Sequence, residues 1–404
     1  MRALRRLATA LRTVSAAALV VLGGGAVVRA IGAAFDPYRA YPGHTSDYGV
    51  ARTRALRTAL PDIAERPDKT VIVLGSSGLA RAFVPAAFDA ALERGGERYV
   101  SFNMAQLLLQ PETALAMARV IRSTYEARHK RLGITIFGIS VPELERAAVR
   151  AARDKMSDQA FAFTSAAALS ERARTRPREA VMDALTFLVF GDVRPERVGL
   201  WVEDWARGQP SPCESGVKQP PDGAEAQAEL DAFCAELRRQ FPRGVSPWNP
   251  AARGGLDFGL PATRPMLEHL VALQSAAISA PLPPPAGPIP ERDDIDEDAV
   301  RTLIAAVREL RAVSEHVVVL RDLMNPVLVA PLPPARFAQW RGVAERIARE
   351  GGAPLIDPND GAFGPADFGD RTHLHPLAAE RFSSRLADRM KPLLEGSEGS
   401  RASR

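Results

Sequence analysis

Two short stretches near opposite ends of the chain carry residues whose types suit nucleophilic catalysis. They are Gly75-Ser76-Ser77 and Asp370-Arg371-Thr372-His373. A serine hydroxyl becomes a good nucleophile only when an imidazole accepts its proton, and the imidazole needs an acceptor that fixes its tautomer. We therefore take Ser77 as the candidate nucleophile, His373 as the base and Asp370 as the acceptor. In such a group of residues, the Ser77 hydroxyl would attack the carbonyl carbon of an ester.

Alternatives remain open at these positions. Ser76 is the second candidate nucleophile, and either Asp357 or Asp367 would replace Asp370 as the acceptor. His375 is expected to cap a helix or to lie on the surface. No ligand cluster accompanies the histidines, and the glycine-flanked serines match no phosphate-binding motif. We therefore expect no metal site and no cofactor.

Both stretches are expected to follow strands of one parallel sheet. Residues 71–74 form an apolar run without alternation, which is typical of a strand buried on both faces. Gly75 then allows the backbone to turn sharply. Residues 354–357 are the predicted last strand, and the loop after it carries His373. Because ligands bind at the carboxyl edge of such sheets, the hydroxyl and the imidazole are predicted to meet there.

The remaining sequence alternates strands with helices on either side of the segment 142–295. Further strands are predicted at 99–103, 132–139 and 316–320, and helices at 85–94, 111–128, 298–314, 335–350 and from 376. This order predicts an α/β fold with a five-stranded parallel sheet between two layers of helices. The segment 142–295 lacks strand signals, so we expect a large helical insertion between strands three and four.

The N-terminus has the pattern of a segment that enters a membrane. Four arginines precede an apolar run over 14–28. Residues 1–35 are therefore predicted to be a membrane anchor or a cleaved signal, with the rest of the chain facing outward. Residues 36–69 form a stalk and a helix, 70–395 the main domain, and 396–404 a disordered tail.

Composition and charge indicate which classes of partner to expect. The 404 residues are 46% hydrophobic, which permits a large core, and the net charge of +4 comes from scattered rather than clustered arginines. We therefore expect no nucleic-acid binding. Cys213 and Cys234 would form either a disulfide outside the cytoplasm or two unpaired thiols.

The G-S-S motif at 75–77 and the D-x-x-H-L-x-P motif at 370–376 together resemble the SGNH/GDSL hydrolase superfamily. The resemblance covers about 70–140 and 315–395. It is closest to membrane-anchored, extracytoplasmic members, such as the proteins of alginate O-acetylation and of D-alanyl transfer to teichoic acid. It implies a flavodoxin-like three-layer fold, with Ser77 as the nucleophile.

The same resemblance implies a function and a location. The activity would be that of a serine esterase or an O-acyltransferase acting on an acylated envelope polysaccharide, with a membrane-bound acyltransferase as a further partner. The location would be the inner membrane with the catalytic domain in the periplasm, or the outside of the cell after signal cleavage. A protein that keeps the fold as a binding or accessory module without catalysis is the alternative.

That alternative stays open because the oxyanion donors depart from the pattern of the superfamily. In the superfamily, one sequence block usually supplies a glycine N–H, but the matching stretch here, 102–105, contains no glycine. Another block is usually G-x-N-D, and here Ser140 stands in place of its asparagine. We expect donors at the Ser77 N–H, near Ala105, at the Asn103 side chain and at Ser140. Loss of one such donor lowers the rate of comparable enzymes by about 100- to 1000-fold.

Overall fold

The structure is a computed structural model that describes residues 20–31, 48–93, 98–106, 109–152, 177–190 and 289–401, together with isolated residues elsewhere. Most of the predicted anchor or signal over 1–35, both cysteines and the larger part of the 142–295 insertion lie outside the described residues. Within the described part of the chain, no helix combines the length and the apolar character needed to cross a bilayer.

Five parallel strands form one sheet, as predicted. They are β1 (Lys69–Leu74), β2 (Tyr99–Asn103), β3 (Leu132–Ile139), β4 (Ser314–Arg321) and β5 (Leu355–Ile356), in the order β2-β1-β3-β4-β5. This is the order of doubly wound, flavodoxin-like sheets. The α/β class and the all-parallel sheet are therefore confirmed.

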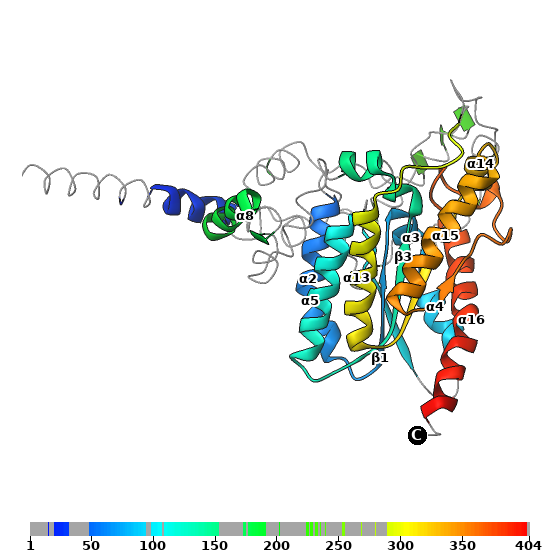
Figure 1. The fold of residues 1–404 in the computed structure, drawn as a ribbon, viewed down its shortest axis with the longest axis horizontal. Coiled ribbons are helices and arrows are strands. Elements are labelled where there is room, and N and C mark those ends of the chain that lie inside the picture. The colour runs from blue at the N-terminus through cyan, green and yellow to red at the C-terminus, as the bar shows by residue number, and fades with distance from the viewer. Residues whose placement is uncertain are drawn as a thin grey trace, which may run out of the picture.

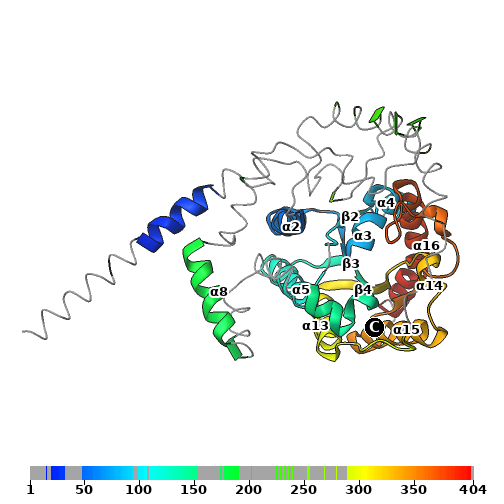
Figure 2. The same ribbon diagram turned by 90° about the horizontal axis from the view of Figure 1, so that it is seen from above.

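Helices cover both faces of the sheet (Figures 1 and 2). One layer contains α2 (Tyr48–Glu65), α5 (Pro111–Glu126), α13 (Glu297–Val313) and α15 (Pro334–Gly351). The other contains α3 (Ser77–Ala82), α4 (Pro85–Leu92) and α16 (Pro376–Arg401). Further helices and helical turns are η1 (Val141–Leu144), α8 (Pro177–Phe190), α14 (Pro326–Val329) and η2 (Pro365–Asp367).

The apolar run of β1 is explained by these two layers. Ile72 and Leu74 belong to the core under α5 and α13, whereas Val71 and Val73 belong to the core under α4 and α16. All four side chains are fully buried. A strand with a core on each face has no polar side to alternate with.

Element ends follow local chemistry. The Asp296 carboxylate accepts a hydrogen bond from the Ala299 N–H at the start of α13, and Gly352 ends α15 with a left-handed φ of 74°. One expectation needs correction: α16 continues to Arg401, through most of the segment 396–404 for which we predicted a disordered tail.

The insertion between β3 and β4 leaves and rejoins the domain at one place. Glu145 and Ile295 form an isolated antiparallel bridge, and the Asp296 N–H donates to the Leu144 carbonyl at 2.8 Å. A segment whose two ends are adjacent can be inserted without disturbing the sheet. Helix α8 is its longest described element.

Candidate active site

The turn after β1 presents Ser77 at the carboxyl edge of the sheet. Gly75 has no room for a side chain, because a Cβ there would lie 2.8 Å from Leu79 Cδ2 and 3.3 Å from Gly138 Cα. Ser76 caps α3, since its Oγ accepts a hydrogen bond from the Gly78 N–H at 3.3 Å. Ser77 is therefore the first residue of a helix that starts directly at the sheet edge.

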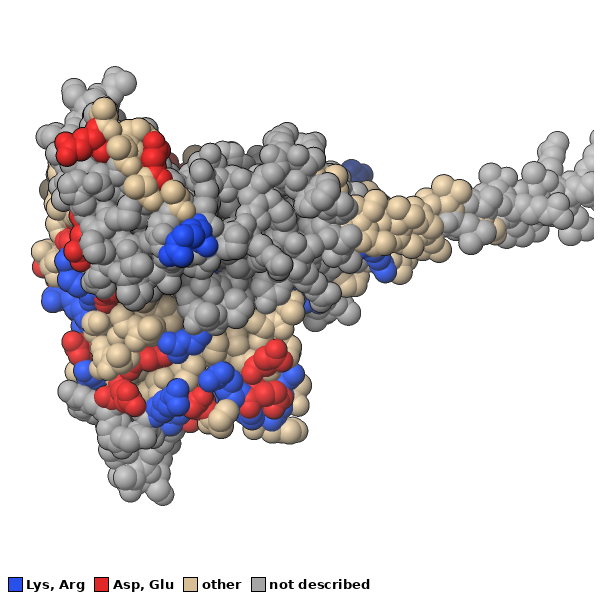
Figure 3. Space-filling model, turned by 180° about the vertical axis from the view of Figure 1, so that it is seen from behind, with Lys and Arg blue, Asp and Glu red and all other residues tan. Residues whose placement is uncertain are grey.

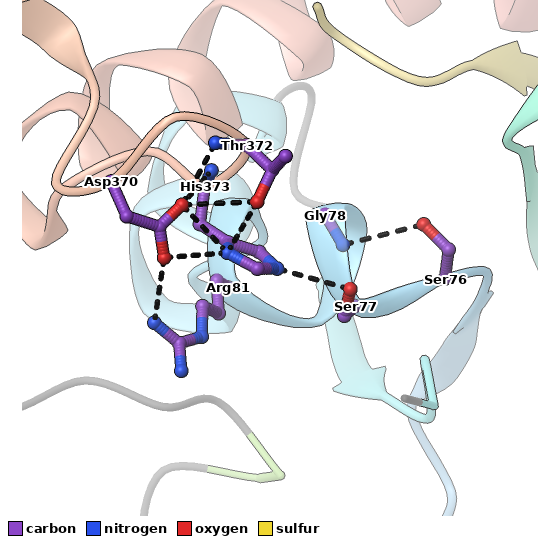
Figure 4. A network of polar contacts seen from close by, with 7 residues as sticks. All are labelled: Ser76, Ser77, Gly78, Arg81, Asp370, Thr372 and His373. Carbon is purple, nitrogen blue, oxygen red and sulfur yellow. Dashed lines mark hydrogen bonds and ion pairs between the residues drawn. The ribbon is translucent and has the colours of Figure 1, made fainter. Parts of the chain in front are cut away.

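The structure brings the three predicted residues together (Figure 4). His373 Nε2 lies 3.0 Å from Ser77 Oγ, and His373 Nδ1 lies 2.8 Å from Asp370 Oδ2. Nδ1 is the nitrogen that faces the carboxylate, so the carboxylate favours a proton at Nδ1 and leaves Nε2 as an acceptor for the serine proton. The three groups form a continuous hydrogen-bonded relay.

The loop that carries His373 is shaped by Asp370 itself. Asp370 Oδ1 accepts hydrogen bonds from the backbone N–H groups of Thr372 and His373, both at 2.8 Å, in the manner of an Asx turn. The Gly369 N–H donates to the His373 carbonyl at 2.8 Å and closes the turn. The D-x-x-H spacing is therefore the spacing that this turn requires.

The charge of Asp370 is stabilised by its partners. Burial would raise the pKa of this carboxyl, but the hydrogen bonds and charge of His373, together with the N–H and hydroxyl of Thr372, outweigh burial and hold the pKa well below its usual range. Arg81 Nη1 lies 3.8 Å from Asp370 Oδ2 and adds a positive charge. An ionised Asp370 is the form that stabilises an imidazolium at His373.

The alternative residues have other roles. Asp357 pairs with Arg321 at 2.7 Å, and the Asp367 carboxylate pairs with Arg381 and accepts from the Gly364 N–H at 2.8 Å. His375 caps α16, as one of its two predicted roles, because its Nδ1 accepts a hydrogen bond from the Ala378 N–H at 3.0 Å. Asp370 is thus the acceptor that contacts the imidazole of His373.

Two of the expected oxyanion donors are engaged within the fold. The Asn103 amide donates to the carbonyls of Ala80 at 2.9 Å and Phe83 at 2.8 Å, and its Oδ1 accepts from the Ala105 N–H at 3.2 Å. The guanidinium of the buried Arg52 also holds this segment, donating to the Ala105 carbonyl at 2.6 Å. We therefore correct the expectation for Asn103 and Ala105, whose donors hold α3 and the end of β2.

Ser140 and the Ser77 N–H remain as oxyanion candidates. Ser140 directly follows β3, the strand next to β1, so it lies at the same sheet edge as Ser77. Its side chain does not cap the following η1 helix. Ser77 is the first residue of α3, where the backbone N–H has no partner within the helix.

A carboxyl group that the sequence did not single out lies behind the nucleophile turn. Asp322 directly follows β4, and its Oδ2 accepts a hydrogen bond from the Ser76 hydroxyl. Its buried Oδ1 has no hydrogen-bond partner among the described residues. Burial raises the pKa of Asp322 to about 6, and burial together with the charge of Asp322 raises the pKa of Glu143 to about 8. Ser76 is thus tied to Asp322 and has no contact with the imidazole in this structure.

A small, mainly apolar hollow lies between the first turn of α3 and the loop that holds His373. Its walls include Gly78, Leu79, Asp322, Thr372, Leu374 and Phe382. The hollow adjoins both the residue after Ser77 and the residue before His373. Among the described residues, no group of three or more His, Cys, Asp and Glu side chains is placed to hold a metal ion.

No protein-family profile matches the chain, and no curated protein matches it.

Proposed function

We propose that this protein is a membrane-tethered, SGNH-type serine esterase or O-acyltransferase that acts on acyl esters of a cell-envelope glycan. The observation that supports this proposal most strongly is the relay from Ser77 Oγ to His373 Nε2 at 3.0 Å and from His373 Nδ1 to Asp370 at 2.8 Å. Its three members come from loops at one sheet edge and match the roles of a nucleophile, a base and an orienting acid.

The proposed reaction proceeds in two halves. Ser77 Oγ attacks the ester carbonyl carbon while His373 Nε2 takes its proton, and Asp370 stabilises the imidazolium. Collapse of the tetrahedral intermediate breaks the ester C–O bond, and His373 returns the proton to the leaving alcohol. Water or a sugar hydroxyl then attacks the acyl group on Ser77 with His373 again acting as base, which regenerates the free serine.

The hollow beside the relay supports a short acyl group. Leu79, Leu374 and Phe382 form apolar walls, and the space between them is small. A compact group such as acetyl suits these walls better than a long acyl chain. The N-terminal apolar run, with its preceding arginines, supports the membrane tether and the outward-facing domain.

A non-catalytic binding module is the second candidate, and one observation favours it. Asn103 and Ala105 hold the fold instead of presenting oxyanion donors. A relay without charge stabilisation at the oxyanion would activate the serine and turn over slowly. Such a protein would serve an acyltransferase by holding its glycan.

A fluorophosphonate probe separates the two candidates. We expect the purified full chain to be labelled, Ser77→Ala to be unlabelled, and Ser76→Ala to retain labelling as the matched control. Hydrolysis of an acetyl ester should be lost in Ser77→Ala. Absence of both labelling and turnover in the unaltered protein would contradict the enzyme proposal and favour the binding module.

A further inference from the structure

Helix α8 presents its apolar residues to the outside and a carboxylate to the inside. Asp183 and Ala180 are buried, at 8% and 3% exposure. Four apolar side chains, by contrast, are between 52% and 66% exposed: Val181, Met182, Leu185 and Leu188. Their spacing places them along one side of the helix. An apolar stripe that faces outward on a helix indicates a surface that binds an apolar partner.

The helix over residues 20–31 lies beside α8 (Figures 1 and 2). Arg29 Nη2 donates to the carbonyl of Leu188 at 2.6 Å and to that of Phe187 at 3.3 Å. Gly25 packs against the backbone of Val189 so closely that a side chain at Gly25 would not fit. The two helices therefore contact one another at the C-terminal end of α8.

The helix over 20–31 also has an apolar surface. Its exposed side chains include Val20, Val21, Leu22 and Val27. We call these exposed side chains and the stripe on α8 together the arm surface. Figure 3 shows that the described atoms of this projecting arm belong mostly to uncharged residues.

Charges at the edges of the arm surface fit an anionic partner. Arg174 and Arg178 are exposed near the N-terminal end of α8. At the other end, Arg29 satisfies two carbonyls of the last turn, where a positive charge also favours the helix dipole. A helix end whose carbonyls have protein partners enters a water-poor region at lower cost.

We propose that α8 is a second membrane contact, which lies in the headgroup region of an anionic bilayer with its apolar stripe toward the acyl chains. With 14 residues it is about 21 Å long, which is short of the ~30 Å hydrocarbon core. It therefore lies along the interface rather than across it. The inference rests on the tether part of the proposed function, because α8 contacts the segment that would enter the membrane.

The lipid surface explains the arm better than a second protein does. The helix that carries the stripe contacts the helix over 20–31, which belongs to the apolar run that follows four N-terminal arginines in the sequence. Arginine next to an apolar helix face matches phosphate headgroups above acyl chains. Contact along α8 would also orient the insertion, and with it the candidate active site, relative to the envelope.

Fluorescence from single labelled positions tests this inference in the full chain. In a Cys213→Ser, Cys234→Ser background, an environment-sensitive NBD dye is attached through Leu185→Cys on the stripe. Leu22→Cys reports on the N-terminal helix. Glu345→Cys, whose side chain is 53% exposed on α15, is the matched control on the sheet domain. Each protein is reconstituted in vesicles of phosphatidylethanolamine and phosphatidylglycerol.

We expect nitroxide-bearing lipids to quench the dye at Leu185→Cys at least about twofold, with quenching also at Leu22→Cys and none at Glu345→Cys. If the dye at Leu22→Cys lies in lipid while that at Leu185→Cys stays accessible to aqueous iodide, the inference about α8 is overturned and the tether stands. If both dyes are aqueous, both fail. Shielding of Leu185→Cys that requires no lipid and grows with protein concentration would assign the stripe to a second copy and also overturn the inference.

Discussion

The two sides of the candidate active site differ in how many of the groups needed for catalysis they present. On the side of the His373 loop, every member of the relay has a partner within 3.0 Å, and Asp370 has further donors from Thr372. On the opposite side, near the ends of β2 and β3, Asn103 and Ala105 hold the fold. Activation of a nucleophile and stabilisation of an oxyanion are therefore separate requirements, and the first is met more fully than the second.

The largest effect should come from the relay side. Asp370→Asn leaves the size of the side chain unchanged but removes the charge that fixes the His373 tautomer. We expect ester turnover to fall by about 10³- to 10⁴-fold in kcat with KM little changed. Asp360→Asn is the control, because Asp360 pairs with Arg385 and Arg389 and makes no contact with the relay in this structure. A loss below about tenfold would show that the relay is not used.

A smaller effect is expected on the oxyanion side. Ser140→Ala removes the one side-chain donor predicted there that has no structural task among the described contacts. We expect kcat to fall by about 100-fold, the lower end of the effect of an oxyanion donor. Ser123→Ala on α5 is the control, since its hydroxyl bonds only to the backbone of its own helix. A change below twofold would mean that backbone groups alone stabilise the oxyanion.

Thr372→Val tests how the relay side is supported. The Thr372 hydroxyl lies 3.0 Å from Asp370 Oδ1 and helps to lower the Asp370 pKa, so its loss should raise that pKa. The carboxylate keeps its backbone donors and its contact with His373, so it stays ionised at neutral pH and the loss acts through how firmly it is held. We therefore expect kcat to be about tenfold lower at neutral pH, without a shift of the pH profile. Thr302→Val, on the exposed face of α13, should leave kcat unchanged.

The smallest expected effect is on stability rather than on activity. Burial and the charge of Asp322 raise the pKa of Glu143 to about 8, so the stability from neutral Glu143 is present below its unfolded pKa and is lost as the pH rises toward 8. Glu143→Gln should unfold like the unaltered protein near pH 4. Above pH 8 it should gain on the order of 2 kcal/mol. Equal melting curves at pH 9 would contradict the raised pKa.

Much of the sheet could be predicted from apolar runs alone. Strands β2 and β3 have the predicted bounds of 99–103 and 132–139, since both runs are buried and end at polar or turn-forming residues. Strand β5 is shorter than the predicted 354–357. It lies at the edge of the sheet, where only β4 is available to pair with it. The contact between Asp370 and His373 followed from the D-x-x-H spacing, because that turn is local. The contact between Ser77 and His373, which spans 296 positions, followed instead from placing both loops at one edge of the sheet.

The surroundings of the relay could not be predicted in the same way. Asp322 meets Ser76 across 246 positions, and nothing in its neighbourhood marks it among the 48 acidic residues of the chain. Asn103 and Ala105 form hydrogen bonds with α3 and with Arg52, and these partners contact them only in the folded protein. A sequence motif predicts contacts that form within a short turn, whereas it does not predict contacts that depend on tertiary packing.

Acylation of Ser77 can be detected by mass spectrometry of the protein after brief exposure to an activated acetyl ester. We expect one acetyl group on the peptide that contains residues 75–81, located at Ser77 by fragmentation, and accumulating further in Ser140→Ala if deacylation also needs the oxyanion donor. Acetylation at Ser76, or none on this peptide while the ester is consumed, would contradict this expectation.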